Sequence, residues 1–141
     1  MCSYCGCRSI SVIAQFSAEH DDIVNATGAL RRAADEGATA LARQRVIDLF
    51  AILDPHTDAE ERGLFHELRQ DAEFTEYVDA LCLEHHDLHA RLRAIADGDF
   101  AAIGKFEHLI RHHIDREDNG LFPAAAVALD GPAWERVIQR T

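Results

Sequence analysis

The chain has 141 residues, of which 48% are hydrophobic and three are proline, and this composition is typical of one globular domain with a buried core. Its formal net charge of -11 argues against nucleic acid and anionic membranes as partners, because both bind cationic surfaces. The sequence shows no apolar run near the roughly 18 to 20 residues of a membrane span and no signal-peptide pattern, so we expect a cytoplasmic protein.

The first predicted element is an irregular, cysteine-rich tail over residues 1–15. It contains Cys2, Cys5 and Cys7, three of the four cysteines in the chain. In a reducing compartment we expect no disulfide framework. Closely spaced thiols suit a soft metal ion or a redox role, and a disordered tail with idle thiols is an equally good interpretation.

Long helices are predicted next, because Ala, Leu, Glu and Arg are common and apolar residues recur every three or four positions. The first helix covers about residues 16–36, with Ser17 as its N-cap and Gly37 just past its end. The second covers about residues 39–69 and contains Pro55, which we expect to kink or loosen it.

The third predicted helix covers about residues 72–96, and a turn follows at residues 97–99. The fourth begins near Phe100 and is interrupted at Pro123. A short last helix is predicted over about residues 134–139.

Four amphipathic helices joined by short turns predict an all-α fold, an antiparallel up-down four-helix bundle. We expect the bundle to occupy residues 16–123. Residues 1–15 then form the N-terminal tail, and residues 124–141 form a C-terminal extension that packs on the bundle.

One ten-residue motif occurs twice, at residues 56–65 and 113–122. Both copies begin with His, carry a carboxylate pair four and five residues later, and end in Gly-Leu-Phe. Residues four apart lie on one face of a helix, so each copy directs an imidazole and a carboxylate to the same place. Neutral nitrogen together with anionic oxygen suits iron or another borderline divalent metal.

One histidine interrupts the apolar stripe of each predicted helix, and these are His20, His56, His85 and His113. Counted from the connecting turns, their depths differ by only a few Å, at about 1.5 Å per residue. A lone histidine on such a stripe is usually an ordinary core residue. Four imidazoles and two carboxylates buried in one layer would be costly without a bound cation, so we interpret this layer as a metal site.

Three more side chains complete the predicted ligand set. His89 lies one turn after the third of these histidines and can reach the same centre. Glu60 and Glu117 face the layer, whereas Glu61 and Asp118 are turned a further 100° and are expected outside it or in contact with the ligands. The predicted metal ligands are His20, His56, Glu60, His85, His89, His113 and Glu117. The other histidines, expected outside the centre, are His66, His86, His108 and His112.

This pattern resembles that of the hemerythrin-like proteins, or HHE cation-binding domains. That family carries a His on helix one, His-x3-Glu on helix two, one His or two spaced by four on helix three, and a His followed by a carboxylate on helix four. The resemblance covers about residues 16–123. In oxygen-carrying hemerythrins the last carboxylate follows its His by five residues, which would select Asp118, whereas HHE domains more often use the fourth, which selects Glu117. The matching residues are His20, His56 with Glu60, His85 with His89, and His113 with Glu117.

The resemblance implies two iron ions bridged by both carboxylates and by an oxo or hydroxo group. With five imidazoles, one iron would take three and the other two, so that the second iron keeps an open position. Ferritin-like di-iron oxidases use Glu-x-x-His motifs, and this chain has none. We therefore expect a non-haem di-iron protein that reversibly binds O2 or a related small ligand (NO or peroxide), as carrier, sensor or scavenger.

Two alternative functions stay open. The first is a di-iron enzyme that consumes peroxide or NO and takes electrons from a redox partner through the tail thiols. The second is an iron-storage or delivery module in which Cys2, Cys5 and Cys7 act as additional soft ligands.

Overall fold

The computed structural model describes the backbone of residues 7–141 and the side chains from residue 11 onward. Cys2 and Cys5 lie outside the described residues, as does the side chain of Cys7. Within residues 7–141 every element of secondary structure is helical. None of these helices combines the length and the apolar character that a membrane span requires.

The first half of the chain forms two long antiparallel helical rods. The first rod is α1, which covers Cys7–Asp35, and Gly37 ends it in a left-handed conformation with φ of 71°. The second rod consists of three segments that follow one another without a break, namely α2 (Thr39–Glu60), the π-helical turn η1 (Glu61–Phe65) and α3 (His66–Leu68).

The second half of the chain repeats this arrangement. Helix α4 covers Ala72–Ala96, and its N-cap Asp71 accepts a hydrogen bond from the backbone of Glu73. A turn at Gly98, with φ of 112°, leads into the next rod. That rod consists of η2 (Phe100–Ala102), α5 (Ile103–Arg116), η3 (Glu117–Leu121) and α6 (Phe122–Ala128), and α7 (Gly131–Arg140) follows it.

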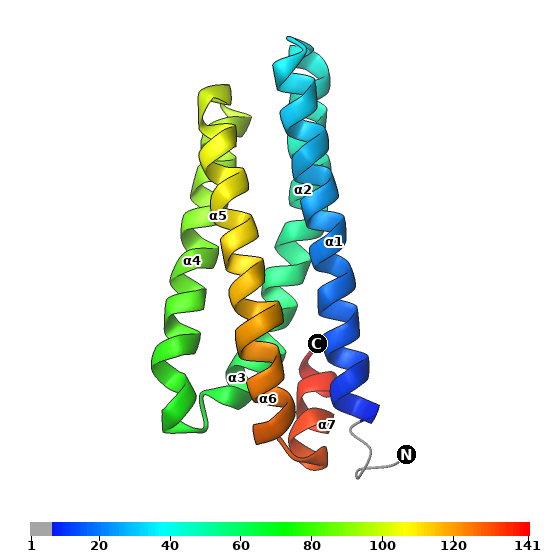
Figure 1. Ribbon diagram of the computed structural model, residues 1–141, viewed down its shortest axis with the longest axis vertical. Helices are drawn as coiled ribbons and strands as arrows, with labels where there is room; N and C mark the ends of the chain where they lie inside the picture. Colours follow the sequence, from blue (N-terminus) through cyan, green and yellow to red (C-terminus); the bar gives the residue numbers. More distant parts are fainter. Residues whose placement is uncertain (1–6) are drawn as a thin grey trace.

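The four rods form a bundle in which α1 contacts α2 and α5, and α4 also contacts α2 and α5 (Figure 1). Successive rods run in opposite directions, as expected when short turns connect amphipathic helices. This confirms the predicted all-α, antiparallel bundle. The second rod also confirms that a helix runs through Pro55.

The N-terminal helix starts earlier than predicted. Residues 7–15 belong to α1, so the predicted irregular tail is wrong for them, and Ser17 lies inside the helix instead of capping it. The cause is tertiary packing, because Val12 and Phe16 are buried and extend the apolar stripe of α1 toward its start. The hydroxyl of Ser17 donates a hydrogen bond to Asp118 Oδ1 at 3.0 Å.

The predicted interruption at Pro123 is also wrong, because α6 continues the fourth rod to Ala128. Pro123 lies in the first turn of α6, directly after the π-helical turn η3, where a proline is tolerated because its missing N–H is not needed. Both α1 and α6 thus cross the borders that divide the chain into residues 1–15, 16–123 and 124–141, and that division stays a prediction.

Two hydrophobic cores fill the bundle, one above and one below a polar layer. The core near the α1–α2 and α4–α5 turns includes Leu30, Leu49 and Phe106. The core at the opposite end includes Phe16 and Leu68. Trp134 and Val137 of α7 are buried in this second core, so the C-terminal helix closes the end of the bundle where the described chain begins (Figure 1).

Candidate metal centre

The polar layer between the two cores consists of six side chains contributed by all four rods. The apolar stripe of each rod passes from one core to the other through this layer, as α1 does at Phe16, His20 and Ile23. Each residue of the layer is at most 4% exposed, and the six residues are His20, His56, Glu60, His85, His113 and Glu117. The predicted convergence of the four histidines is confirmed, because these residues form two groups whose ligand atoms lie within 4.8 Å of one another.

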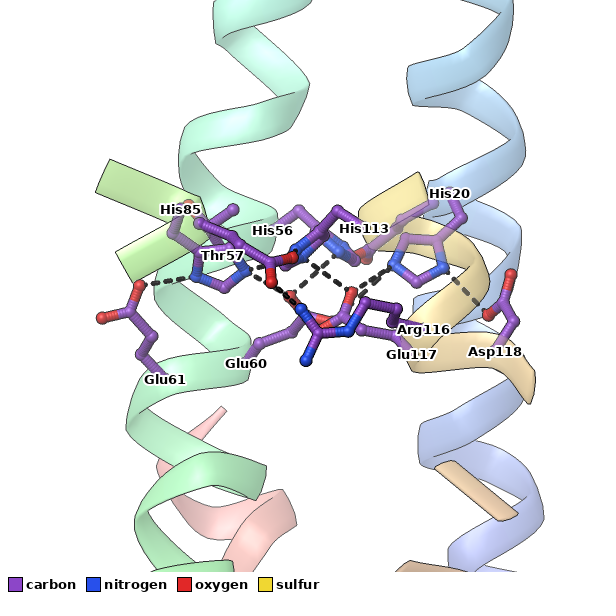
Figure 2. A network of polar contacts seen from close by, with 12 residues as sticks. His20, His56, Thr57, Glu60, Glu61, His85, His113, Arg116, Glu117 and Asp118 are labelled. Atoms are coloured by element: carbon purple, nitrogen blue, oxygen red, sulfur yellow. Dashed lines mark hydrogen bonds and ion pairs between the residues drawn. The ribbon is translucent and has the colours of Figure 1, made fainter. Parts of the chain in front are cut away.

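Each of the four imidazoles is held from outside by a carboxylate of a neighbouring rod. In the part of the layer next to α1 and α2, His20 Nδ1 lies 2.9 Å from Asp118 Oδ1 (Figure 2). His56 Nδ1 lies 2.6 Å from Glu19 Oε1. With Nδ1–H donating to a carboxylate, a neutral imidazole presents the lone pair of Nε2 to the interior.

The other two imidazoles have the same support. His85 Nδ1 lies 2.7 Å from Glu61 Oε2, and His113 Nδ1 lies 2.8 Å from Glu84 Oε1. Arg116 in turn donates to Glu84. A carboxylate on Nδ1 is the usual partner of a metal-bound histidine, because it fixes the ring and makes the other nitrogen a better donor.

The two buried carboxylates lie between the imidazoles. Glu117 Oε1 lies 3.0 Å from His20 Nε2 and 3.2 Å from His113 Nε2, so it joins the first and fourth rods. Glu60 Oε1 lies 3.3 Å from the Nε2 atoms of both His56 and His85, so it joins the second and third rods. Each glutamate therefore contacts one histidine of the first two rods and one histidine of the last two rods.

This geometry divides the centre into two half-sites. His20 and His56 form the first half-site, and His85 and His113 form the second. Each pair groups with the same two carboxylates, Glu60 and Glu117. Two cations bound side by side would share both glutamates, and each cation would have two imidazoles.

The layer is poorly satisfied by protein groups alone. His20 Nε2 and all four carboxylate oxygens of Glu60 and Glu117 are buried and form no hydrogen bond. The Nε2 atom of His20 does lie within ion-pair distance of both carboxylates, 3.7 Å from Glu60 and 3.0 Å from Glu117. His85 Nε2 and His113 Nε2 face each other at 3.1 Å, a contact in which two lone pairs would repel without a proton or a cation between them. Buried polar atoms without partners are costly, and bound cations would satisfy this set.

The protonation equilibria also reflect this demand for positive charge. Burial opposes a charge on His20, but the carboxylates of Glu117 and Glu60, which lie 3.0 and 3.7 Å from its Nε2, outweigh burial and raise the pKa of His20 from 6.5 to about 10. Burial likewise opposes the charge on Glu60, yet the surrounding histidines, His56 foremost, hold its pKa well below the usual range. Neighbouring carboxylates overcome burial to raise the pKa of the other three imidazoles, those of His56, His85 and His113.

His89, predicted to be a fifth imidazole ligand, belongs to neither group of four. Its Nδ1 lies 3.0 Å from Asp54 Oδ1 and its Nε2 lies 3.1 Å from Thr57 Oγ1, both on α2. These two contacts hold the ring one turn away from the centre. The four histidines expected outside the centre are all exposed, and they are His66, His86, His108 and His112.

The sequence reasoning missed two of the supporting carboxylates, Glu19 and Glu84. Each directly precedes a layer histidine. The dipeptide Glu-His occurs at residues 19–20, 84–85 and 107–108, and only in the first two copies does the histidine belong to the layer. Glu19 and Glu84 each support a histidine of a neighbouring rod and not the histidine that follows them in the sequence. The dipeptide could therefore have indicated their supporting role only once the pairing of the rods was known. Glu61 and Asp118 were expected either outside the layer or in contact with its histidines. The structure shows the second arrangement, with Glu61 on His85 and Asp118 on His20.

The repeated Gly-Leu-Phe also has a local role. Phe65 stacks on the ring of His85 with centroids 5.5 Å apart, and Phe122 stacks on that of His20 at 5.7 Å. In each motif copy, the second carboxylate and the phenylalanine therefore hold the same histidine of a neighbouring rod. Glu61 and Phe65 hold His85, and Asp118 and Phe122 hold His20.

A family model for the "Hemerythrin HHE cation binding domain" matches residues 11–125. No significant match was found among curated proteins or among solved structures. The matched range contains the whole polar layer and the carboxylates that support it. On this match, which spans most of the chain, the protein belongs to the hemerythrin HHE cation-binding domain family.

Proposed function

We propose that this protein holds two iron ions in the polar layer and binds O2 or a related small ligand there, as a carrier, sensor or scavenger. The observation that carries the proposal is the pair of overlapping ligand groups, which share Glu60 and Glu117. Imidazole together with carboxylate suits iron in preference to softer or harder metals. When bound, the iron pair supplies coordination positions that protein groups leave open, and O2, NO or peroxide would bind at these positions.

The two groups of side chains support a different distribution of ligands from the one expected from the sequence. Four imidazoles reach the layer instead of five, so the two ions would have two each in place of three and two. Both ions would then have a similar number of open coordination positions. The unequal division into three and two imidazoles, expected from the sequence, is absent from the described groups.

The rest of the chain gives the layer rigidity and keeps water away. The outer carboxylates fix each imidazole, and the two hydrophobic cores cover the layer above and below. Phe65 and Phe122 cover one face of His85 and of His20. A dry, preorganised site favours reversible binding of a small neutral ligand and limits proton access to it.

Metal analysis combined with optical spectroscopy tests the proposal. The protein is loaded with Fe2+ under argon, and two ions per chain are expected, with near-ultraviolet and visible bands that appear on exposure to O2 and reverse under argon. His85→Ala should lose about one of the two ions and the O2-dependent bands, whereas the adjacent, exposed His86→Ala serves as the matched control and should keep both ions and the bands. Fewer than two ions per chain in the wild type, or bands that ignore O2, would contradict the proposal.

A di-iron enzyme that consumes peroxide or NO is the second candidate, and the similar half-sites favour it, because both ions would offer positions to one substrate. Catalytic turnover of peroxide that disappears in His113→Ala and persists in His112→Ala would support the enzyme. Consumption limited to one equivalent per site would support the binding protein instead. The storage or delivery alternative depends on Cys2, Cys5 and Cys7, whose side chains lie outside the described residues.

A further inference from the structure

A cation needs a path to the polar layer, because every one of its six residues is at most 4% exposed. In the part of the chain that the structure describes, a surface hollow reaches each of two layer histidines. One, of about 390 Å³, lies between α1 and α2 and touches His56. The other, of about 380 Å³, lies between α2 and α4 and touches His85.

The two hollows differ in chemistry. The hollow at α1–α2 contains no imidazole besides His56, and the amide of Gln15 and the guanidinium of Arg62 line it together with carboxylates. The hollow at α2–α4 contains two further imidazoles, those of His86 and His89. Its carboxylates belong to Asp54, Asp58 and Glu61, and its one cationic side chain is Arg93. Nitrogen and oxygen donors together are the ligand set that a borderline divalent ion prefers.

His89 is oriented as the layer histidines are. Asp54 holds its Nδ1 from the solvent side, and its Nε2 points inward to the hydroxyl of the buried Thr57, which precedes the layer residue Glu60 by three positions. The side chain of His89 is 21% exposed, so solvent reaches it, unlike the layer. Burial lowers the pKa of His89, which keeps this imidazole neutral and able to bind a cation at pH 7.

Glu61 connects this hollow to the centre. Its side chain is 36% exposed and lines the hollow, while Oε2 accepts the hydrogen bond of His85 Nδ1 at 2.7 Å. Figure 2 shows Glu61 beside His85 at the edge of the layer. A cation in the hollow is therefore separated from the second half-site only by the imidazole that would bind it.

We propose that divalent cations reach the centre through the hollow between α2 and α4, where His89, supported by Asp54, captures them before transfer past His85. This inference rests on the proposed metal-binding function and adds a loading site that is distinct from the final ligands. The carboxylates of the hollow raise the local cation concentration, and the inward-facing Nε2 of His89 exchanges its bond to Thr57 for the ion.

Stopped-flow loading of the full-length, metal-free protein with Fe2+ under argon tests the route. His89→Ala should load at least about tenfold more slowly, in line with the rate gain that focused charges give, and should reach the same final iron content as the wild type. Asp54→Asn, an exposed position that leaves the core untouched, should slow loading in the same direction. Asp22→Asn, in the hollow between α1 and α2, is the matched control and should load at the wild-type rate.

Each result distinguishes the route from the proposed function. Wild-type loading rates in both His89→Ala and Asp54→Asn would overturn the loading site, as would slower loading in Asp22→Asn alone. A lower final iron content in His89→Ala, with an unchanged circular dichroism spectrum and melting temperature, would make His89 a ligand of the centre and would also overturn it. If the wild type takes up no iron, the proposed function itself fails.

Discussion

In the first half-site, Glu19 holds His56 and accepts its other hydrogen bond from the neutral amide of Gln15, at 3.2 Å. In the second half-site, Glu84 holds His113 and is paired with Arg116. The guanidinium of Arg116 also lies over the ring of Tyr77, 5.0 Å from its centroid. Among the described carboxylates that hold layer histidines, Glu84 alone forms an ion pair with an arginine.

This difference predicts unequal cation affinities for two half-sites that offer the same donor atoms. A carboxylate on Nδ1 strengthens the imidazole as a donor, and an arginine that neutralises this carboxylate reduces the effect. The positive charge of Arg116 also repels a cation in the second half-site. We therefore expect the first half-site to bind its ion more tightly than the second.

The largest expected effect comes from the groups that the half-sites share. Glu60→Gln should reduce the iron content close to zero, because both cations lose the same anionic ligand. Glu61→Gln, at the adjacent outer position, should keep at least the ion of the first half-site and weaken the second about 10- to 100-fold. Metal analysis after dialysis measures both, and retention of two ions in Glu60→Gln would show that the carboxylate is not shared.

Single imidazole removals separate the half-sites. His56→Ala and His113→Ala should each retain about one of two ions, because each leaves the opposite pair and both glutamates in place. Titration with Co2+ against a competing chelator gives the number of ions and their dissociation constants. Loss of both ions in either variant would mean that the half-sites are filled only together.

Arg116→Met tests the source of the difference between them. In the His56→Ala background, where the second half-site remains, this change should tighten Co2+ binding about tenfold by removing the opposing charge. In the His113→Ala background it should have no effect. Weaker binding in the first of these double variants would show that Arg116 acts by bracing Glu84 and not by its charge.

The two Gly-Leu-Phe copies also differ in what covers them. A Cβ added at Gly63 would lie 2.5 Å from Thr141 Oγ1 and 3.1 Å from the backbone oxygen of Val137, whereas one at Gly120 would lie 3.0 Å from the hydroxyl of Tyr77. Gly63→Ala should lower the free energy of unfolding by about 1–3 kcal/mol, and Gly120→Ala by less, because a side chain moves more easily than α7. Chemical denaturation measures both, and the reverse order would contradict the assigned role of α7.

The smallest effect concerns the anchor of α7, which contacts η1 and α1 and so braces the rods of the first half-site. Glu67, 6% exposed, accepts hydrogen bonds from Arg136 and Arg140. The pKa of Glu67 is lowered from 4.5, mainly by the hydrogen bond from Arg136. The stabilisation that the ionised carboxylate gives the folded state is therefore present above pH 4.5 and is lost as the pH falls through the lowered pKa. Glu67→Gln should cost about 1 kcal/mol at pH 7, since both arginines are partly exposed.

Urea unfolding of the wild type and Glu67→Gln at pH 7 and pH 3 measures the change. The difference between the two proteins should shrink at the lower pH. A difference independent of pH would show that the ion pair contributes nothing and that only the shape of the side chain matters.

The fold and the burial of six of the seven predicted ligands in one layer could be predicted from the sequence, because helical periodicity is a strong local signal. The bounds predicted for α4, residues 72–96, agree with the structure. Helical spacing likewise selects Glu117 over Asp118 for the interior. The π-helical turns η1, which starts directly after Glu60, and η3, which starts at Glu117, preserve this arrangement.

The remaining features depend on contacts between rods, which local periodicity does not contain. Residues 7–15 are helical because Val12 is buried in the core that α7 completes. His89 has the spacing of a ligand, but Asp54 and Thr57 on the adjacent rod hold it outside the layer. Glu19 and Glu84 acquire their roles only where a neighbouring rod supplies the imidazole.

Anomalous diffraction from crystals of the iron-loaded protein, recorded at the iron absorption edge, tests the central claim most directly. We expect two peaks, one beside His20 and His56 and one beside His85 and His113, with Glu60 and Glu117 in contact with both. A single peak, or iron that lies away from these six side chains, would contradict it.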